Sequence, residues 1–474
     1  MTEPMLKIAV VGHTNTGKTS LLRTLTRDSR FGDVADSPGT TRHVEGARLR
    51  LDGRPVLEWF DTPGMEDSIA LLEYLERLDA PGTRSDGPAR IHRFLDSPEA
   101  HRRYEQEARV LAKMLDCDAA LYVIDARDPV LSKHRDELAL LAACGRPLLP
   151  VLNFVNAPAH RADEWRDAMA RLGLHAALEF DTVAPPLDGE RQLYAKLGVL
   201  LDRHAATLNR LSDELARQRH ERTQAAWQLA ADLLVDIAAL RLASPADDDA
   251  LQAHAAALRE QVRRREQACV DALLALYNFR RSDYTEDDLP LEGTRWGMDL
   301  FHPQALKDMG IQLGTGMAAG AMAGAAVDLF SAGLSLGTGM LIGAAAGGLW
   351  QGVERFGGRI LGKLRGYREI TVDDAVLRLL ALRQRQLIVA LERRGHAARD
   401  PVRLDRPADN AWRSGRLPDA LKEARSRPEW SALGKGHEDD ERRKRVVADL
   451  AQALATADPA PQTTHNPQRI QPPE

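Results

Sequence analysis

The sequence predicts a chain in two parts: an α/β domain with a mostly parallel sheet flanked by helices, then an all-α C-terminal half with a Gly/Ala-rich helical hairpin. Short β-branched runs alternate with helical stretches from Lys7 to about Leu201, as in a parallel sheet wrapped by helices. After about Leu201 no comparable strand pattern recurs, and apolar residues are spaced as in helices. Between Met309 and Val353 the composition changes to Gly, Ala and Met.

These patterns set the expected elements in order, and a chain of 474 residues is too long for one ordinary core. The predicted strands are Ile8–Val11, Ala47–Leu51, Val56–Phe60, Ala120–Ile124, Leu148–Leu152 and Ala176–Phe180. Two long helices are expected on either side of a break at Pro245 and an N-cap near Asp247, and a further helix at Asp373–Arg394. The predicted domains are the α/β domain at 1–205 with an insertion at about 66–117, a long-helix region at 206–300, the hairpin at 301–366, a helical region at 367–457 and a disordered tail at 458–474.

The composition is that of a globular protein with a formal net charge of −5. This balance provides no broad basic field, so we expect no specific nucleic-acid partner. Cys117, Cys144 and Cys269 show no paired spacing and are interpreted as reduced core thiols. The first seven residues lack the basic and then apolar layout of a signal peptide, so the α/β domain is expected in the cytoplasm.

A phosphate-binding loop follows the first predicted strand. The segment from Gly12 to Ser20 contains Gly-x-x-x-x-Gly-Lys-Thr and lies at the start of a predicted helix. Glycines at both ends allow backbone N–H groups to surround phosphates. Lys18 is expected to reach the β- and γ-phosphates, and the Thr19 hydroxyl is expected to ligate Mg²⁺. The expected phosphate-binding residues are Gly12, His13, Thr14, Asn15, Thr16, Gly17, Lys18, Thr19 and Ser20.

Two further segments complete the expected metal and γ-phosphate site. Asp61 follows an apolar strand, where a nucleotide hydrolase needs an acidic residue near the metal, and the Gly64 amide is placed to contact the γ-phosphate. Thr41, in a polar loop between these segments, is expected to add a hydroxyl ligand. The predicted metal ligands are Thr19, Thr41 and Asp61, and the predicted catalytic residues are Lys18, Thr41 and Gly64.

In this order, the loop, the Gly-Thr-Thr-Arg segment at 39–42 and the Asp-Thr-x-Gly segment at 61–64 resemble the Era and TrmE group of bacterial GTPases. Over the whole chain, the sequence is similar to a proteobacterial family in which such a P-loop GTPase domain is fused to a C-terminal region of unknown function. The resemblance implies a Mg²⁺-dependent switch that hydrolyses GTP to GDP and phosphate. It also implies a K⁺ site to which Asn15 contributes; the alternative is that Asn15 only caps the loop.

The same resemblance places guanine recognition at 153–156, where the group has Asn-Lys-x-Asp. Asn153 is retained, Phe154 is expected to cover the base in place of the lysine, and Asn156 replaces the aspartate. An amide offers guanine one acceptor and one donor instead of two acceptors, which costs about 1–3 kcal/mol of selectivity. Asp181 and Thr182 take the place of the group's last base-contacting element, through their backbone.

Two features leave the extent of turnover open. Met65 follows Gly64, where many GTPases have a glutamine that orients water, so hydrolysis by the protein alone is expected to be slow. The long insertion is interpreted either as a partner-binding or lid element or as a passive surface excursion. Protein partners are expected at the insertion or the helical half. The alternative function is a nucleotide-binding scaffold with little turnover, associated with the membrane through the hairpin.

The Gly/Ala-rich stretch itself leaves two interpretations open. Gly316, Gly320 and Gly324 are spaced by four, as are three later glycines, so two helices with flat strips are expected. One interpretation is a helical hairpin in the inner membrane, and the other is a tightly packed helix pair in a soluble domain. Further along, the basic run at 442–445 is interpreted as a solvated helix face, with contact to nucleic acid or anionic lipid as the alternative.

Overall fold

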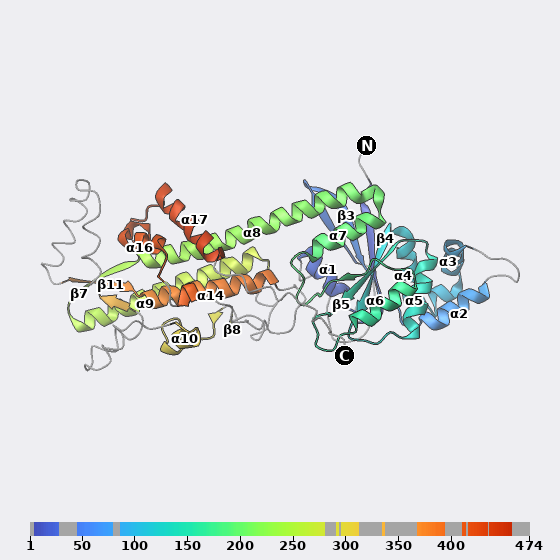
Figure 1. Cartoon of the computed structure of the whole chain (residues 1–474), viewed down its shortest axis with the longest axis horizontal. Coiled ribbons are helices and arrows are strands. Elements are labelled where there is room, and N and C mark those ends of the chain that lie inside the picture. The colour runs from blue at the N-terminus through green and yellow to red at the C-terminus, as the bar shows by residue number, and fades with distance from the viewer. Residues whose placement is uncertain are drawn as a thin grey trace, which may run out of the picture. The chain divides into compact units, whose positions relative to one another are not determined.

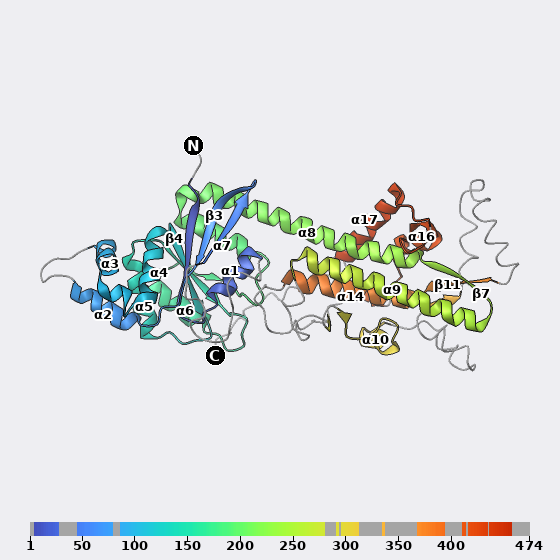
Figure 2. The ribbon, with the colours of Figure 1, turned by 180° about the vertical axis from the view of Figure 1, so that it is seen from behind.

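The computed structural model describes residues 4–27, 45–78, 86–279, 291–292, 295–311, 334–336, 367–393, 410–413, 416–434 and 436–456. The chain divides into two units, shown in Figures 1 and 2 and taken here one after the other. The first unit comprises 1–221, 278–285 and 391–401, and the second comprises 222–277, 286–390 and 402–474. The predicted metal ligand Thr41 lies outside the described residues.

A six-stranded sheet with the order β2-β3-β1-β4-β5-β6 forms the centre of the first unit. Its strands are β1 (Leu6–Val11), β2 (Glu45–Leu51), β3 (Arg54–Asp61), β4 (Ala119–Asp125), β5 (Leu148–Asn153) and β6 (Leu178–Glu179). All neighbouring strands run parallel except β2 and β3, which are antiparallel. The α/β fold, with its mostly parallel sheet and six predicted strands, is therefore confirmed.

Helices cover both faces of this sheet (Figure 1). Because successive strand residues point to opposite faces, Ala9 and Val11 of β1 pack in one apolar cluster, and Ile8 and Val10 pack in another. The first cluster includes residues of α2 (Ser68–Leu78), α3 (Gly87–Leu95), α4 (Glu105–Asp116), α5 (Ser132–Ala143) and α6 (Ala162–Arg171). The second includes residues of α1 (Lys18–Thr26), α7 (Gly189–Leu200) and the first part of α8 (Ala205–Ala239).

The predicted insertion contributes α2, α3, a 3₁₀ turn at Pro98–His101 and α4, all between β3 and β4. Ile91, Phe94 and Tyr104 of this segment are buried in the same cluster as residues of β1 and β4. The Phe94 and Tyr104 rings meet edge to face, with centroids 6.2 Å apart. The insertion is thus a layer of the first unit's core, which argues against a passive surface excursion.

Three long helices dominate the second unit: the C-terminal part of α8, α9 (Asp248–Leu276) and α14 (Asp374–Arg393). They lie side by side in both views of the ribbon (Figures 1 and 2) and bury leucines such as Leu233, Leu258 and Leu380. The Asp247 side chain caps α9 by accepting a hydrogen bond from the Ala250 N–H. The helical C-terminal half, the N-cap near Asp247 and the helix at 373–394 are confirmed.

Contrary to prediction, strands also occur beyond Leu201. β11 (Tyr367–Val372) pairs antiparallel with β7 (Arg241–Pro245) and with β10 (Leu334–Leu336), and its Ile370 side chain is buried. β7 has no β-branched residue and so little strand propensity of its own; pairing with β11 supplies the stabilisation that its sequence lacks. β8 (Leu291–Glu292) and β9 (Arg295–Trp296) form a second small ladder.

The interpretation of the basic run at 442–445 as a solvated face is wrong for Arg443. The run lies at the start of α17 (Glu441–Thr456), and the Arg443 guanidinium is buried with its Nη2 2.7 Å from Asp232 and 2.8 Å from Asp236 of α8. These two carboxylates offset the cost of removing its charge from water. The other described helices and turns are α10 (Pro303–Asp308), α15 (Asn410–Arg413), α16 (Asp419–Ser426), and 3₁₀ turns at Asp202–His204 and Pro428–Trp430.

The glycine rows of the predicted hairpin lie outside the described residues. Within the second predicted helix of that hairpin, Leu334–Leu336 is a strand, so a helix does not run through these three residues. Over the part of the chain that the structure describes, none of the helices combines the length and the apolar character needed to cross a membrane.

All three cysteines are buried, and none forms a disulfide. Burial raises the pKa of Cys117, Cys144 and Cys269 to about 12, because a thiolate is poorly solvated in an apolar core. The prediction of reduced core thiols is confirmed.

Candidate functional site

The phosphate-binding loop connects the end of β1 at Val11 with the start of α1 at Lys18. Its two outer glycines are required by the backbone. Gly12 has φ +145° and Gly17 has φ +89°, and a Cβ would lie 2.4 Å from the Val123 carbonyl oxygen at Gly12 and 2.3 Å from the Asn153 amide nitrogen at Gly17. The loop therefore lies directly on the carboxyl ends of β4 and β5, where open parallel sheets bind their ligands.

Lys18 is buried and turns back into this loop. Its ammonium donates hydrogen bonds to the carbonyls of His13, at 2.7 Å, and Gly12, at 3.2 Å. Burial lowers the pKa of Lys18, against the smaller opposing effect of the Asp61 and Glu137 carboxylates. A buried cation in a loop of this shape fits phosphate groups. Their negative charge would compensate the ammonium more fully than the two carbonyl groups do.

Thr19 and Asp61 meet at the same end of the sheet. The Thr19 hydroxyl lies 2.5 Å from Asp61 Oδ2, although the two residues come from α1 and the end of β3. A hydroxyl and a carboxylate side by side are the hard oxygen ligands that Mg²⁺ prefers, so the two residues fit the predicted metal. Asn15, the predicted K⁺ ligand, is exposed and has φ 65°, and its role in K⁺ binding stays a prediction.

The segment that follows Asp61 lies against the phosphate-binding loop. A Cβ on Gly64 would come within 2.3 Å of the Thr14 hydroxyl, so only glycine permits this approach. Met65 forms an isolated parallel bridge with His13, and its side chain is fully buried in the apolar cluster. The Met65 thioether is therefore kept away from solvent, and it has no proton to donate to a water molecule.

Sequence reasoning missed Glu107, which holds this segment from the side. One oxygen of the buried Glu107 carboxylate accepts hydrogen bonds from the backbone N–H groups of Glu66 and Asp67, both at 3.0 Å. Glu107 lies in α4, the last helix of the insertion. Nothing in the local sequence signals this contact, because it joins residues about 40 positions apart.

His13 also has partners that the sequence did not predict. Its Nδ1 lies 2.7 Å from Glu137 Oε1, and its Nε2 lies 2.9 Å from the Lys133 ammonium. Since an ammonium can only donate, Nε2 accepts from Lys133, and Nδ1 faces the Glu137 carboxylate as a donor. The fully buried Glu137 also accepts from the Tyr122 hydroxyl at 2.8 Å. The loop is thereby tied to α5 by residues four positions apart on one helix face.

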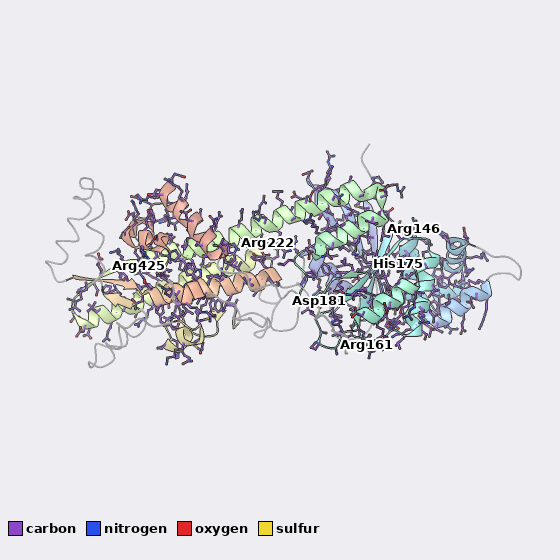
Figure 3. All side chains as sticks on the ribbon, in the orientation of Figure 1. Arg146, Arg161, His175, Asp181, Arg222 and Arg425 are labelled. Atoms are coloured by element: carbon purple, nitrogen blue, oxygen red, sulfur yellow. The ribbon has the colours of Figure 1, made fainter. Side chains whose placement is uncertain are left out.

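At the other end of the site, Asn153 joins the three loops where a base is expected. Its buried amide donates to the Thr16 carbonyl at 3.0 Å and accepts from the N–H groups of Phe154 and Thr182, both at 2.9 Å. Asp181, labelled in Figure 3, accepts from the Asn156 N–H at 2.9 Å. The structure thus brings the predicted base-binding residues together, and the hydrogen bonds of Asn153 and Asp181 connect their loops.

Phe154 stands between the phosphate-binding loop and Arg127. Phe154 has φ 58°, and its ring tip lies 3.3 Å from where a Cβ on Gly17 would stand. The Arg127 guanidinium lies 4.0 Å from the ring centroid and is held there by Asp125, with nitrogen–oxygen distances of 2.9 and 2.7 Å. Arg127 is a second residue that sequence reasoning missed, since its only local signal is its place just after a buried strand.

Two family models match the chain. The model described as "50S ribosome-binding GTPase" matches residues 7–154, which include the phosphate-binding loop, Asp61, Gly64 and Asn153. The model described as "Domain of unknown function (DUF3482)" matches residues 166–452, more than half of the chain. A P-loop GTPase domain is thus followed by a domain of unknown function, as the sequence resemblance implied.

Two curated relatives each match less than a third of the chain. The tRNA modification GTPase MnmE of Phocaeicola vulgatus is 26% identical over 138 residues, 29% of this chain and 27% of the relative. The GTPase Der of Xylella fastidiosa is 30% identical over 154 residues, 31% of this chain and 25% of the relative. The chain thus spans about a quarter of the length of each of these two relatives.

Solved structures align more weakly. Era of Aquifex aeolicus bound to GDP and AlF4⁻ aligns with a TM-score of 0.27 and 16% identity, over 37% of this chain and 50% of that chain. The G domain of the FeoB iron transporter of T. maritima aligns with a TM-score of 0.25 and 19% identity, over 42% of this chain and 99% of that domain.

Proposed function

The chain belongs to the family described as a domain of unknown function (DUF3482), and we propose that its first unit is a Mg²⁺-dependent GTPase that acts as a molecular switch. The observation that carries this proposal is the meeting of three segments at one loop: Lys18 inside it, Asp61 beside Thr19, and Gly64 against Thr14. Phosphoryl transfer depends mainly on positioning and on charge stabilisation, and these segments supply both.

In the proposed reaction, water attacks the γ-phosphate of GTP in line, and GDP and phosphate leave. Lys18 and the loop N–H groups bind the phosphates and offset their charge. Thr19 and Asp61 would hold Mg²⁺, with Thr41 as the predicted third protein ligand; when bound there, Mg²⁺ supplies positive charge to the phosphate oxygens. The Gly64 N–H contacts the γ-phosphate. When the γ-phosphate leaves, this contact is lost, and the segment after Gly64 that Glu107 holds can change conformation.

Turnover by the protein alone is expected to be slow. Met65 is buried and offers nothing to the attacking water, so rapid hydrolysis requires an additional positive charge or a positioning group. We assign that role to K⁺ bound with the help of Asn15, or to a protein partner that contacts the insertion. Either would act on the segments that contain Thr41 and Gly64, without entering the apolar core that holds Met65.

The deciding experiment measures phosphate release from GTP by the full-length protein with Mg²⁺, first in K⁺ and then in Na⁺. Release is expected to be faster in K⁺ and to fall to background in Lys18→Ala, because the loop then loses its only buried ammonium within the described residues. The matched control is Lys307→Ala, which removes an exposed lysine of α10. Equal background release by the wild type and Lys18→Ala would show that the protein is not a GTPase.

The second candidate function is a nucleotide-binding scaffold with little turnover, associated with the membrane through the Gly/Ala-rich stretch. The buried Met65 favours it. It predicts tight Lys18-dependent GTP binding without phosphate release, and cosedimentation of the full-length protein with vesicles. A ribosome- or RNA-directed role, suggested by the names of the matched model and relatives, is weaker because the formal net charge is −5.

A further inference from the structure

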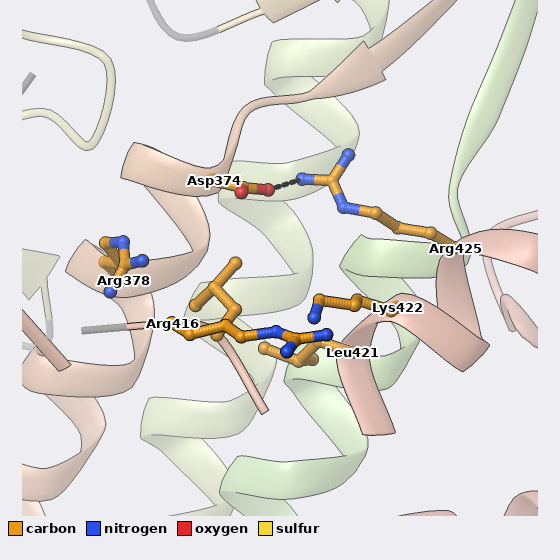
Figure 4. A pocket seen from close by; sticks show the side chains of 7 residues that line it. Asp374, Arg378, Arg416, Leu421, Lys422 and Arg425 are labelled. Atoms are coloured by element: carbon orange, nitrogen blue, oxygen red, sulfur yellow. Dashed lines mark hydrogen bonds and ion pairs between the residues drawn. The ribbon is translucent and has the colours of Figure 1, made fainter. Parts of the chain in front are cut away.

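The second unit contains a pocket of about 290 Å³ with a mostly cationic lining (Figure 4). Two of its walls are α14 and α16, and a third is the short segment that precedes α16. Arg425, which Figure 3 also labels, reaches across to α14. The lining residues are Asp374, Arg378, Arg416, Leu417, Leu421, Lys422 and Arg425.

Among the described residues, the four cations of this pocket contact backbone carbonyls and the carboxylates of Asp374 and Asp419. Arg416 and Lys422 both contact the same Asp419 oxygen, at 3.4 and 2.9 Å. Arg425 pairs with Asp374 and donates to the Val372 carbonyl, and Arg378 donates to the Trp412 carbonyl at 3.1 Å. The pocket lining itself carries four cations and one carboxylate, Asp374, in a chain whose formal net charge is −5.

The chemistry of the lining favours phosphate groups. Leu417 and Leu421 also line the pocket and are buried, and they offer no acceptor to the cations. The cations themselves are accessible to a ligand, since the Arg416 and Lys422 side chains are 79% and 44% exposed. Guanidinium groups also match phosphate oxygens with paired N–H donors, and three of the four cations are arginines.

We propose that this pocket binds a small phosphorylated ligand with at least two negative charges, as a second site separate from the nucleotide site of the first unit. Its volume lies near the lower limit of about 300 Å³ for ligand pockets, which suits one or two phosphate groups on a small organic part. A soluble phosphate ester and a lipid headgroup share this chemistry, and the test below separates them.

The test titrates inorganic pyrophosphate into the full-length protein by calorimetry, in a Lys18→Ala background that disables the phosphate-binding loop. Saturable binding is expected, and the pair Arg378→Gln and Lys422→Gln should weaken it at least tenfold. The matched pair Lys444→Gln and Arg445→Gln removes the same charge, also from one lysine and one arginine, at exposed positions of α17 and should change the Kd less than twofold. Absence of saturable binding, or equal weakening by both pairs, would overturn the proposal.

A further variant guards against misfolding, and vesicles identify the source of the phosphate. Arg416→Gln alters a side chain that is 79% exposed, so the fold should survive and binding should still weaken. Vesicles that contain phosphatidic acid are then compared with phosphatidylcholine vesicles. Binding to phosphatidic acid that pyrophosphate displaces would assign a lipid headgroup, and pyrophosphate binding alone would assign a soluble ligand. If Arg416→Gln bound both pyrophosphate and phosphatidic acid vesicles with unchanged affinity, the proposed site would be wrong.

Discussion

Asn156 stands where the Era and TrmE group has an aspartate, and its side-chain amide donates to the Ala184 carbonyl at 3.4 Å. Its backbone N–H is held by Asp181, so the loop is in place even though the side chain differs from the group pattern. A carboxylate accepts both N–H groups of the guanine edge, whereas an amide opposes one of them. Xanthine has a carbonyl oxygen in place of the guanine amino group, and the N–H of an amide can donate to it.

We therefore expect the wild type to bind GTP with only a small margin over XTP, and ATP more weakly than either. Asn156→Asp should favour GTP over XTP by roughly tenfold or more, since a hydrogen bond to a charged carboxylate contributes about 1.5–3 kcal/mol. Competition against a fluorescent nucleotide measures the three affinities. Asp188→Asn, at the N-cap of α7, is the control and should leave them unchanged. A wild type that already excludes XTP would mean that another residue compensates for Asn156.

Residues within the motifs could be predicted from the sequence, and their long-range partners could not. The spacing from Gly12 to Thr19 fixes a local backbone path, so the placement of Lys18 beside the loop carbonyls follows from the motif itself. Glu137 reaches His13 over 124 positions. Which carboxylate reaches which donor at that separation depends on how α5 packs on the sheet, and a single sequence carries no signal for this packing.

At the scale of elements, α4 links the insertion to the segment after Gly64. Glu107→Ala would leave the N–H groups of Glu66 and Asp67 without their buried acceptor. We expect their hydrogen exchange to accelerate about tenfold and kcat for GTP to change with little effect on nucleotide affinity, because the phosphate-binding loop is untouched. Amide exchange by mass spectrometry and steady-state kinetics measure the two effects.

Two variants separate this positioning effect from general destabilisation of α4. Glu107→Gln keeps one acceptor oxygen and should retain most of the exchange protection. Glu105→Ala removes an exposed carboxylate from the same helix, where its partner is Arg109, and should behave as the wild type. Unchanged exchange at Glu66 and Asp67 in Glu107→Ala would exclude a role for α4 in holding this segment.

Elements with a strong internal pattern were predicted, and elements that depend on a distant partner were missed. The strands β1, β4 and β5 carry apolar or β-branched runs, and α14 carries a helical period, so each is recognisable by itself. β7 has the sequence Arg-Leu-Ala-Ser-Pro, and its pairing partner β11 lies more than 120 positions away. Its strand form is decided by pairing, which local propensity does not report.

At the scale of the whole molecule, α8 serves both units. Leu208, Leu211 and Leu215 belong to the apolar core of the first unit, while Asp236, near the C-terminal end of the helix, is buried in the second. There Asp236 accepts from Arg265 of α9 at 2.7 Å and from Arg443 of α17 at 2.8 Å. The neighbouring Asp232 contacts the same two arginines, at 2.8 and 2.7 Å, and Asp439 lies 3.3 Å from the Arg443 guanidinium.

Asp236→Asn removes one charge from this buried set and leaves Arg265 and Arg443 with Asp232 and Asp439, both of which are partly exposed. Breaking a buried ion network in this way costs about 3–5 kcal/mol, so the second unit should unfold at lower urea concentration. Nucleotide affinity should stay within twofold, because the phosphate-binding loop and its partners lie in the first unit. Amide exchange resolved along the chain and nucleotide titration measure the two effects, with the exposed Arg442→Gln as control. If affinity fell together with stability, α8 would transmit the loss from one unit to the other, and the nucleotide site would depend on the integrity of the C-terminal domain.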